Sequence, residues 1–180
     1  MINLLTAVIL ILFAALSRLL PHPMNFAPVT AIALFAGVYL NKKYAFIIPI
    51  IALIISDAII GFYPYVFWIY GTILLIALIG LWLKANVQNA GAVKKVSYIA
   101  GTTVVSSLIF FIVTNFGVWT SGMFYEMNWS GLMQCYAMAI PFFRNSLMGD
   151  IVYVSAMFGI YELVTRTVKK DSLQQSVIKK

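Results

Sequence analysis

Four polar side chains that are costly inside a membrane stand within strongly apolar stretches. Arg18 lies in ALSRLLPHP, Asp57 in IISDAIIGFY, Asn115 in FFIVTNFGVW and Asp150 in RNSLMGDIVY. A charged side chain at the bilayer centre costs about 2.5–3.5 kcal/mol on insertion scales, so each needs a structural or functional reason. Two interpretations fit. The four groups converge at one membrane depth around a ligand cavity, or Arg18 pairs with Asp57 and Arg144 with Asp150, which only holds helices together.

The loops between apolar stretches that lie next to these four groups are rich in side chains that hydrogen-bond or stack. His22 and Asn25 follow Arg18 in the loop after the first apolar stretch, and Tyr63 and Tyr65 follow the apolar stretch that contains Asp57. Aromatic rings also form belts at membrane interfaces, which explains part of this excess. On the ligand interpretation, the predicted substrate-binding residues are Arg18, Asn25, Asp57, Asn115, Trp119, Tyr125, Trp129, Tyr136, Arg144 and Asp150.

Signatures of catalysis are missing from the sequence. One histidine and one cysteine cannot build the histidine-rich metal sites of membrane hydroxylases or desaturases. No Walker motif, dinucleotide fingerprint or HExxH sequence occurs. We therefore predict no enzyme activity, no catalytic residue and no cofactor. The alternatives left open are a membrane enzyme acting on a lipid or quinone, with His22 paired to Asp57 or Glu126, and a structural or assembly subunit of a membrane complex.

Composition places the chain in a lipid bilayer. Of its 180 residues 63% are hydrophobic and 9% charged, and the mean hydropathy is +0.98, whereas soluble domains carry about 25% charged residues. The net charge of +7 comes from dispersed lysines without a basic helix or a stacking platform, so nucleic acid is not a predicted partner. The single cysteine, Cys135, excludes an intrachain disulfide.

Apolar runs predict an all-α protein with six transmembrane helices. A hydrocarbon core of about 30 Å needs roughly 20 apolar residues per helix. The predicted spans are 3–20, 26–40, 44–62, 65–84, 96–118 and 146–166, the first of them an uncleaved span and the second short and partly inside the bundle. The stretch Gly131–Phe143 is too short to cross, so we expect it to form a short surface helix between the last two spans. Residues 1–168 then make one domain, and 169–180 a basic tail.

Positive charge alternates between the loops that join the predicted spans, and this alternation predicts on which side of the membrane each loop lies. Ten of the twelve cations fall in every second interval or at the carboxyl terminus, and the two exceptions are Arg18 and Arg144. Because positively charged loops are retained in the cytoplasm, both termini are expected there, and the ligand-binding side chains on the opposite side.

Small residues recur at four-residue spacing in the second span. The pairs are Ala27 with Ala31 and Ala33 with Gly37. Such spacing lets helix backbones approach closely. We consider two uses for this face, packing within the bundle and docking onto another membrane subunit.

The strings NFAPV, TNFGVW and CYAMAIPFFRN, in this order along the chain, resemble a family of small, uncharacterised six-helix bacterial membrane proteins. That family is distantly similar to the S components, the substrate-binding membrane subunits of energy-coupling factor (ECF) vitamin transporters. The resemblance implies an S-component-like bundle in the bacterial cytoplasmic (inner) membrane. It also implies an outward-facing pocket under the loops that join spans 1–2, 3–4 and 5–6.

Vitamin uptake is the function that this resemblance implies. S components bind riboflavin, thiamin, biotin or cobalamin and normally dock on a transmembrane coupling subunit with two ATPases, although a solitary mode is also conceivable. Ala27, Ala31, Ala33 and Gly37 are then a docking face, although S components usually carry their alanine-rich motif on the first helix. Cobalamin is the substrate we expect first, because a thiolate such as that of Cys135 can ligate corrinoid cobalt. The corrinoid would be a substrate rather than a cofactor.

Overall fold

Six α-helices make up the part of the chain that the structure describes. The structure is a computed structural model that describes the backbone of residues 2–178 and the side chains of residues 4–168. The predicted basic tail, 169–180, therefore lies outside the described side chains. The helices are α1 (Ile2–Ser17), α2 (Val29–Tyr39), α3 (Lys42–Ile60), α4 (Val66–Val87), α5 (Ala92–Thr120) and α6 (Trp129–Ile178). No strand occurs among these residues, which confirms the prediction of an all-α chain. Six transmembrane helices and a separate surface helix were predicted, whereas the described residues form six helices in all.

Four of the helices are long and apolar enough to cross a membrane, namely α3, α4, α5 and the first forty residues of α6. The other two, α1 and α2, are apolar but shorter. The first helix was predicted to extend to Leu20 and the second to begin at Phe26. The chain instead leaves helical geometry between Ser17, where α1 ends, and Val29, where α2 begins. Pro21, Pro23 and Pro28 explain this break, because proline disfavours helical geometry at the preceding residue.

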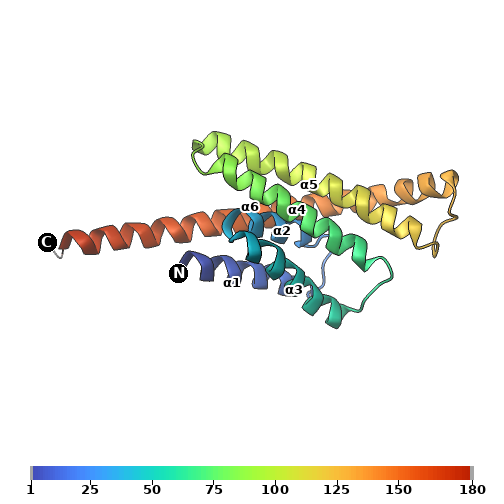
Figure 1. The fold of residues 1–180 in the computed structure, drawn as a ribbon, viewed down its shortest axis with the longest axis horizontal. Coiled ribbons are helices and arrows are strands. Elements are labelled where there is room, and N and C mark those ends of the chain that lie inside the picture. The colour runs from blue at the N-terminus through green and yellow to red at the C-terminus, as the bar shows by residue number, and fades with distance from the viewer. Residues whose placement is uncertain (1, 179–180) are drawn as a thin grey trace.

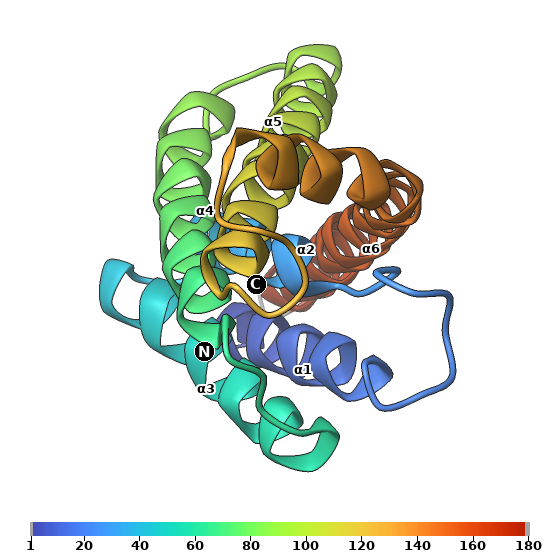
Figure 2. The same cartoon turned by 90° about the vertical axis from the view of Figure 1, so that its right-hand side faces the viewer.

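The short helix α2 forms the centre of the bundle. Viewed along the bundle, it lies inside a ring made by the other five helices (Figure 2). Every side chain from Val29 to Val38 is buried, and Phe35 packs edge-on against Phe158 of α6 with ring centroids 5.3 Å apart. A helix that is apolar on all sides is expected in such a central position. The prediction that this helix sits within the bundle is confirmed.

Two glycines allow the central helix to approach α4 closely. A Cβ atom at Gly37 would lie 2.5 Å from the carbonyl oxygen of Ala77 and 2.6 Å from the Cα of Gly80. Ala31 and Ala33 are fully buried as well. The small-residue face therefore packs inside this chain. The alternative that Ala27, Ala31, Ala33 and Gly37 dock onto another subunit is wrong, because three of the four are sealed within the bundle and Ala27 is half-buried beside it.

The helix ends divide into two groups. Both termini lie at the same end of the molecule as the α2–α3 and α4–α5 connections (Figure 1). At the opposite end are the connections α1–α2, α3–α4 and α5–α6. We call this second group the loop end. Lys42 begins α3, Lys84 lies in the last turn of α4 and Lys94 in the first turn of α5. These helix ends lie at the end of the bundle that carries the termini, so the alternation of charge in the sequence matches the two ends of the bundle.

The segment predicted as a separate surface helix is the beginning of α6. Residues 129–178 form one continuous helix of 50 residues that includes Pro141. Figure 2 shows its first part crossing the loop end and the remainder running along the bundle. Proline in a helix interior removes a backbone hydrogen bond and kinks the helix without necessarily ending it. The prediction of two separate helices was therefore wrong, although the segment does cover one end of the bundle.

Candidate functional site

A network of buried polar side chains joins α1, α3 and α4 near the loop end. Arg18 Nη2 donates to Oδ1 of Asp57 at 2.7 Å, and Arg18 Nη1 donates to the hydroxyl of Ser56. The Tyr70 hydroxyl donates to the other carboxylate oxygen, Oδ2, at 2.9 Å. Asp57 is fully buried, and only 10% of the Arg18 side chain is exposed. The carboxylate therefore has an opposite charge and a hydroxyl donor in place of water, which is how a buried charge is tolerated.

A cavity lies directly beside this network. Its volume is about 360 Å³, at the small end of the roughly 300–1,000 Å³ typical of ligand pockets. Each of the six helices, or a loop next to it, contributes to the wall. The polar and aromatic lining residues are Arg18, His22, Asn25, Thr30, Tyr63, Tyr65, Phe110, Thr114, Asn115 and Ser146.

A second hollow of about 420 Å³ continues from the first. The two share Asn25, Tyr65, Asn115 and Val118, so these four side chains stand between them. The second hollow is otherwise mainly apolar and is bordered by α6 at Met138, Ala139 and Phe142, with Tyr125 and Cys135 beside them. We call the two hollows together the loop-end pocket.

The α1–α2 connection is fixed against α6, which shapes one wall of the pocket. Asn25 has a φ of 62°, a left-handed conformation that asparagine tolerates better than most residues. Asn145 Nδ2 donates to the carbonyl oxygen of Met24 at 3.1 Å. A Cβ atom at Gly149 would approach the Cα of Phe26 to 3.2 Å, so the loop lies directly on α6 there. These contacts hold Asn25 at the border of both hollows.

Two further side chains are oriented for hydrogen bonding in the pocket. Asn115 Nδ2 donates to the carbonyl oxygen of Phe111 at 2.8 Å, which fixes the plane of its amide. In the α3–α4 loop, the Tyr63 and Tyr65 rings contact each other at a tilt of 41°, with centroids 4.9 Å apart. Burial raises the pKa of Tyr63 to about 12, and the nearby Asp57 carboxylate acts in the same direction. The Tyr63 phenol therefore stays protonated at neutral pH and can donate a hydrogen bond.

Asp150 lies below the pocket and does not line it. Its side chain is almost fully buried, and Oδ2 accepts a hydrogen bond of 2.6 Å from the hydroxyl of Ser107 on α5. Its Oδ1 has no partner among the described residues. Ser146, one helical turn earlier on α6, does line the pocket. Arg144 is exposed and forms none of the ion pairs found within residues 4–168, so the predicted pairing of Arg144 with Asp150 is wrong.

Besides Asp57 and Asp150, four more of the predicted binding residues do not line the pocket. The indole of Trp119, near the end of α5, donates to the carbonyl oxygen of Glu126 in the α5–α6 connection at 3.0 Å. The Tyr136 hydroxyl donates to the carbonyl oxygen of Ile112 at 2.7 Å and so ties α6 to α5. Trp129 and Arg144 are exposed. Of the ten predicted residues, Arg18, Asn25, Asn115 and Tyr125 line the pocket, and Asp57 supports it from behind through Arg18.

Several pocket residues were not among the predicted ones. Thr30, Thr114 and Ser146 are ordinary helix residues whose orientation depends on packing, so no local signal in the sequence singles them out. Tyr65 and His22 stood in the intervals already recognised as rich in binding groups. The signal that could have identified Tyr65 and His22 as pocket residues was their position in loops between two apolar runs.

The described residues contain no group of three or more His, Cys, Asp and Glu side chains that could hold a metal ion. Cys135, the predicted cobalt ligand, borders the second hollow but is buried, and its Sγ lies 3.4 Å from the carbonyl oxygen of Asn115. Its thiol is thus directed at the backbone of α5.

The comparison with known proteins gives a family. A model described as "Family of unknown function (DUF6580)" matches residues 1–173, and the chain belongs to this family. No curated protein and no solved structure matches the chain.

Proposed function

We propose that this member of DUF6580 binds a small polar molecule in the loop-end pocket and is the substrate-binding membrane subunit of a vitamin or micronutrient uptake transporter. The observation that carries the proposal is the arrangement of the pocket. Residues from all six helices or their adjoining loops surround one polar cavity, although they are spread from Arg18 to Ser146. A small number of polar side chains that converge on one cavity in an otherwise apolar protein is the usual sign of a ligand site.

The chemistry of the lining favours a ligand that is held by hydrogen bonds. The charge of Arg18 is balanced by Asp57, so the cavity carries little net charge. Asn25 and Asn115 offer amide groups, and Tyr63 and Tyr65 offer hydroxyls and flat rings. A heteroaromatic vitamin with polar substituents matches such a lining.

The size of the pocket narrows the choice of ligand. The first hollow, with about 360 Å³, suits a molecule such as thiamin or biotin. Cobalamin is much larger, and even the two hollows together leave little space for its corrin ring and nucleotide loop. We therefore rank cobalamin below the smaller vitamins.

Binding without catalysis is supported by the partners of the titratable groups. A reactive pair of His22 and Asp57 was the alternative for a membrane enzyme. In the structure Asp57 is engaged by Arg18 and Tyr70, and the Nδ1 of His22 lies 3.0 Å from the carbonyl oxygen of Pro23. Asp57 and His22 are thus each engaged by other groups of the pocket wall, which favours a structural role for both over a reactive pair.

The proposed topology has both termini in the cytoplasm of a bacterium and the loop end on the outer side of its inner membrane. It is supported by the lysines near the end that carries the termini, since such charges are retained in the cytoplasm. With this orientation the pocket receives its ligand from outside. Release inward then requires movement of the bundle, driven by a transmembrane coupling subunit with ATPases or by the substrate gradient.

Equilibrium dialysis with radiolabelled thiamin, riboflavin, biotin and cobalamin tests the proposal. We expect saturable one-to-one binding of one of the three smaller vitamins, and a loss of about tenfold in affinity in Asn115→Ala, the equivalent of one or two hydrogen bonds. Asn86→Ala is a matched control. Asn86 also donates to the carbonyl oxygen four residues earlier at 2.8 Å, but at the other end of the bundle. Equal affinity in both variants contradicts the proposed site.

A further inference from the structure

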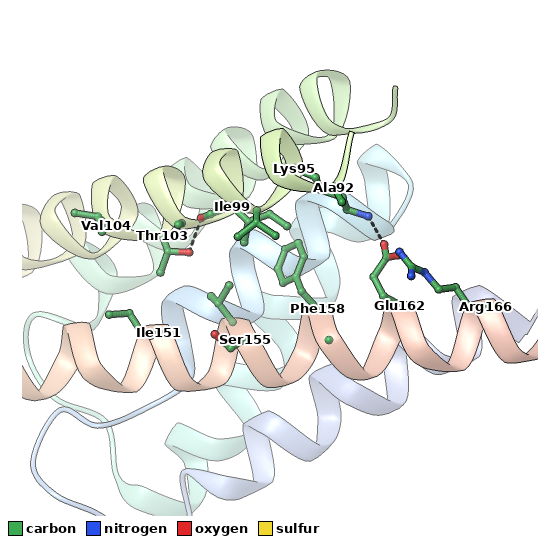
Figure 3. Close-up of a pocket in the computed structure, with 14 residues that line it drawn as sticks. Ala92, Lys95, Ile99, Thr103, Val104, Ile151, Ser155, Phe158, Glu162 and Arg166 are labelled. Carbon is green, nitrogen blue, oxygen red and sulfur yellow. Dashed lines mark hydrogen bonds and ion pairs between the residues drawn. The ribbon is translucent and has the colours of Figure 1, made fainter. Parts of the chain in front are cut away.

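A long groove runs between α5 and α6, apart from the loop-end pocket. Its volume is about 490 Å³, and its walls are largely apolar. Figure 3 shows Ile99 and Val104 of α5 facing Ile151 and Phe158 of α6 across it. The groove is widened at Gly159, where a side chain would meet no atom within 4 Å.

Charged side chains close one end of this groove only. Lys95 of α5 forms an ion pair and a hydrogen bond with Oε1 of Glu162, which also accepts a hydrogen bond of 3.3 Å from the Tyr39 hydroxyl. Arg166 Nε lies 3.5 Å from Oε2 of the same carboxylate. The Arg166 side chain is 77% exposed, so its terminal nitrogens remain accessible. Two cations and one anion leave this end of the groove with one net positive charge, which one phosphodiester neutralises.

The length of the groove matches one leaflet of a bilayer. At a rise of about 1.5 Å per residue, the lining residues span about 18 Å of α5 and about 22 Å of α6. Half of a hydrocarbon core of about 30 Å is about 15 Å. An acyl chain in the groove thus reaches from the middle of the membrane to the level of Lys95 and Arg166, where headgroups begin.

A second groove on the other side of α5 provides an internal comparison. It lies between α4 and α5, has a volume of about 590 Å³ and is lined by residues such as Leu78, Trp82 and Gly101, without a charged side chain. Both grooves suit acyl chains, but only the α5–α6 groove offers a cationic end for a phosphate.

We propose that the α5–α6 groove is a binding site for one anionic phospholipid. The acyl chain lies along Ile99, Val104 and Phe158, and the phosphate is held by Lys95 and Arg166. The inner leaflet of a bacterial membrane supplies such lipids, and basic pockets between transmembrane helices are known to bind their headgroups. The site is separate from the loop-end pocket, and its placement in the inner leaflet rests on the topology proposed above.

Native mass spectrometry of the purified chain, loaded with phosphatidylglycerol or with phosphatidylcholine of the same acyl chains, tests the proposal. We expect one phosphatidylglycerol to be retained in preference to phosphatidylcholine. Arg166→Gln removes an exposed cation without disturbing the core, and the preference should fall about fivefold. Gly159→Leu fills the α5–α6 groove and should abolish the preference for phosphatidylglycerol.

Gly101→Leu is the matched control, because Gly101 also has open space around it but lines the uncharged α4–α5 groove. It should leave the preference for phosphatidylglycerol unchanged. Equal retention of the two lipids by the unmodified chain contradicts the proposal. So does an unchanged preference in Arg166→Gln, or a second protein chain retained in the groove in place of lipid.

Discussion

Arg18 and Asp57 are joined by an ion pair of 2.7 Å between residues 39 positions apart in the sequence. The pair links the end of α1 to α3 and places the Arg18 guanidinium in the wall of the loop-end pocket. It therefore has two roles, since it holds the bundle together and presents a polar group to a ligand.

Asp57→Asn should destabilise the protein strongly. The change keeps the shape of the side chain but leaves Arg18 buried without an anion, and breaking a buried ion pair on one side costs about 3–5 kcal/mol. Thermal unfolding of the detergent-solubilised protein measures the effect. The double variant Arg18→Leu, Asp57→Leu removes both charges and should recover much of the loss. A single variant as stable as the unmodified protein shows that the pair contributes little.

Gly37→Ala should weaken the packing of the central helix. The added methyl group would lie 2.5 Å from a backbone oxygen of α4, so the two helices must separate. Overpacking of this kind costs roughly 1–3 kcal/mol. Gly71→Ala is the control, because a Cβ atom at Gly71 meets nothing within 4 Å and alanine favours a helix by about 1 kcal/mol. A lower melting temperature is expected for the first variant and a higher one for the second, and the reverse order contradicts the α2–α4 crossing.

Tyr63 should make stability depend on pH only in alkaline solution. Its pKa is about 12 in the folded chain, above the usual value of 10.0, because burial disfavours the phenolate. The stabilisation from this residue is thus fully present below pH 10 and is lost as the pH rises towards 12. Chemical unfolding of the unmodified protein and of Tyr63→Phe across this range measures it. The difference in stability between the two should shrink with rising pH, and a constant difference shows that Tyr63 titrates normally.

Asp150→Asn should be tolerated. Its carboxyl group accepts one hydrogen bond from Ser107 and has no countercharge among the ion pairs of the described chain. The asparagine oxygen can accept the same hydrogen bond, and the amide avoids a charge in a low-dielectric surrounding. We expect stability unchanged within about 0.5 kcal/mol or increased. Loss of the folded protein indicates instead that the carboxylate binds a group essential to the bundle.

The sequence predicted the helices and the end at which binding groups collect, because both follow from one-dimensional patterns. Apolar runs indicate which segments become helices, and the alternation of charge indicates which helix ends lie on the same side of the membrane. Arg18 and Asn115 were accordingly expected near one level, and both line the loop-end pocket.

The direction of each side chain could not be predicted in the same way. Asp150 and Ser146 are one turn apart on α6, and packing decides that Ser146 borders the cavity and Asp150 does not. Whether Pro141 ends a helix or bends it depends on tertiary contacts too, so the single helix α6 was missed. The docking face was misjudged because small residues permit close packing without specifying the partner.

The central claim, that the loop-end pocket binds a small molecule, is tested most directly by native mass spectrometry after incubation with the small-molecule fraction of a bacterial extract. Val118 borders both hollows, so Val118→Trp fills the pocket, whereas Val93→Trp adds the same bulk at an exposed position of α5. We predict one small adduct of discrete mass on the unmodified chain and on Val93→Trp, and none on Val118→Trp. An unmodified, folded chain without an adduct, or an adduct that persists in Val118→Trp, contradicts the account.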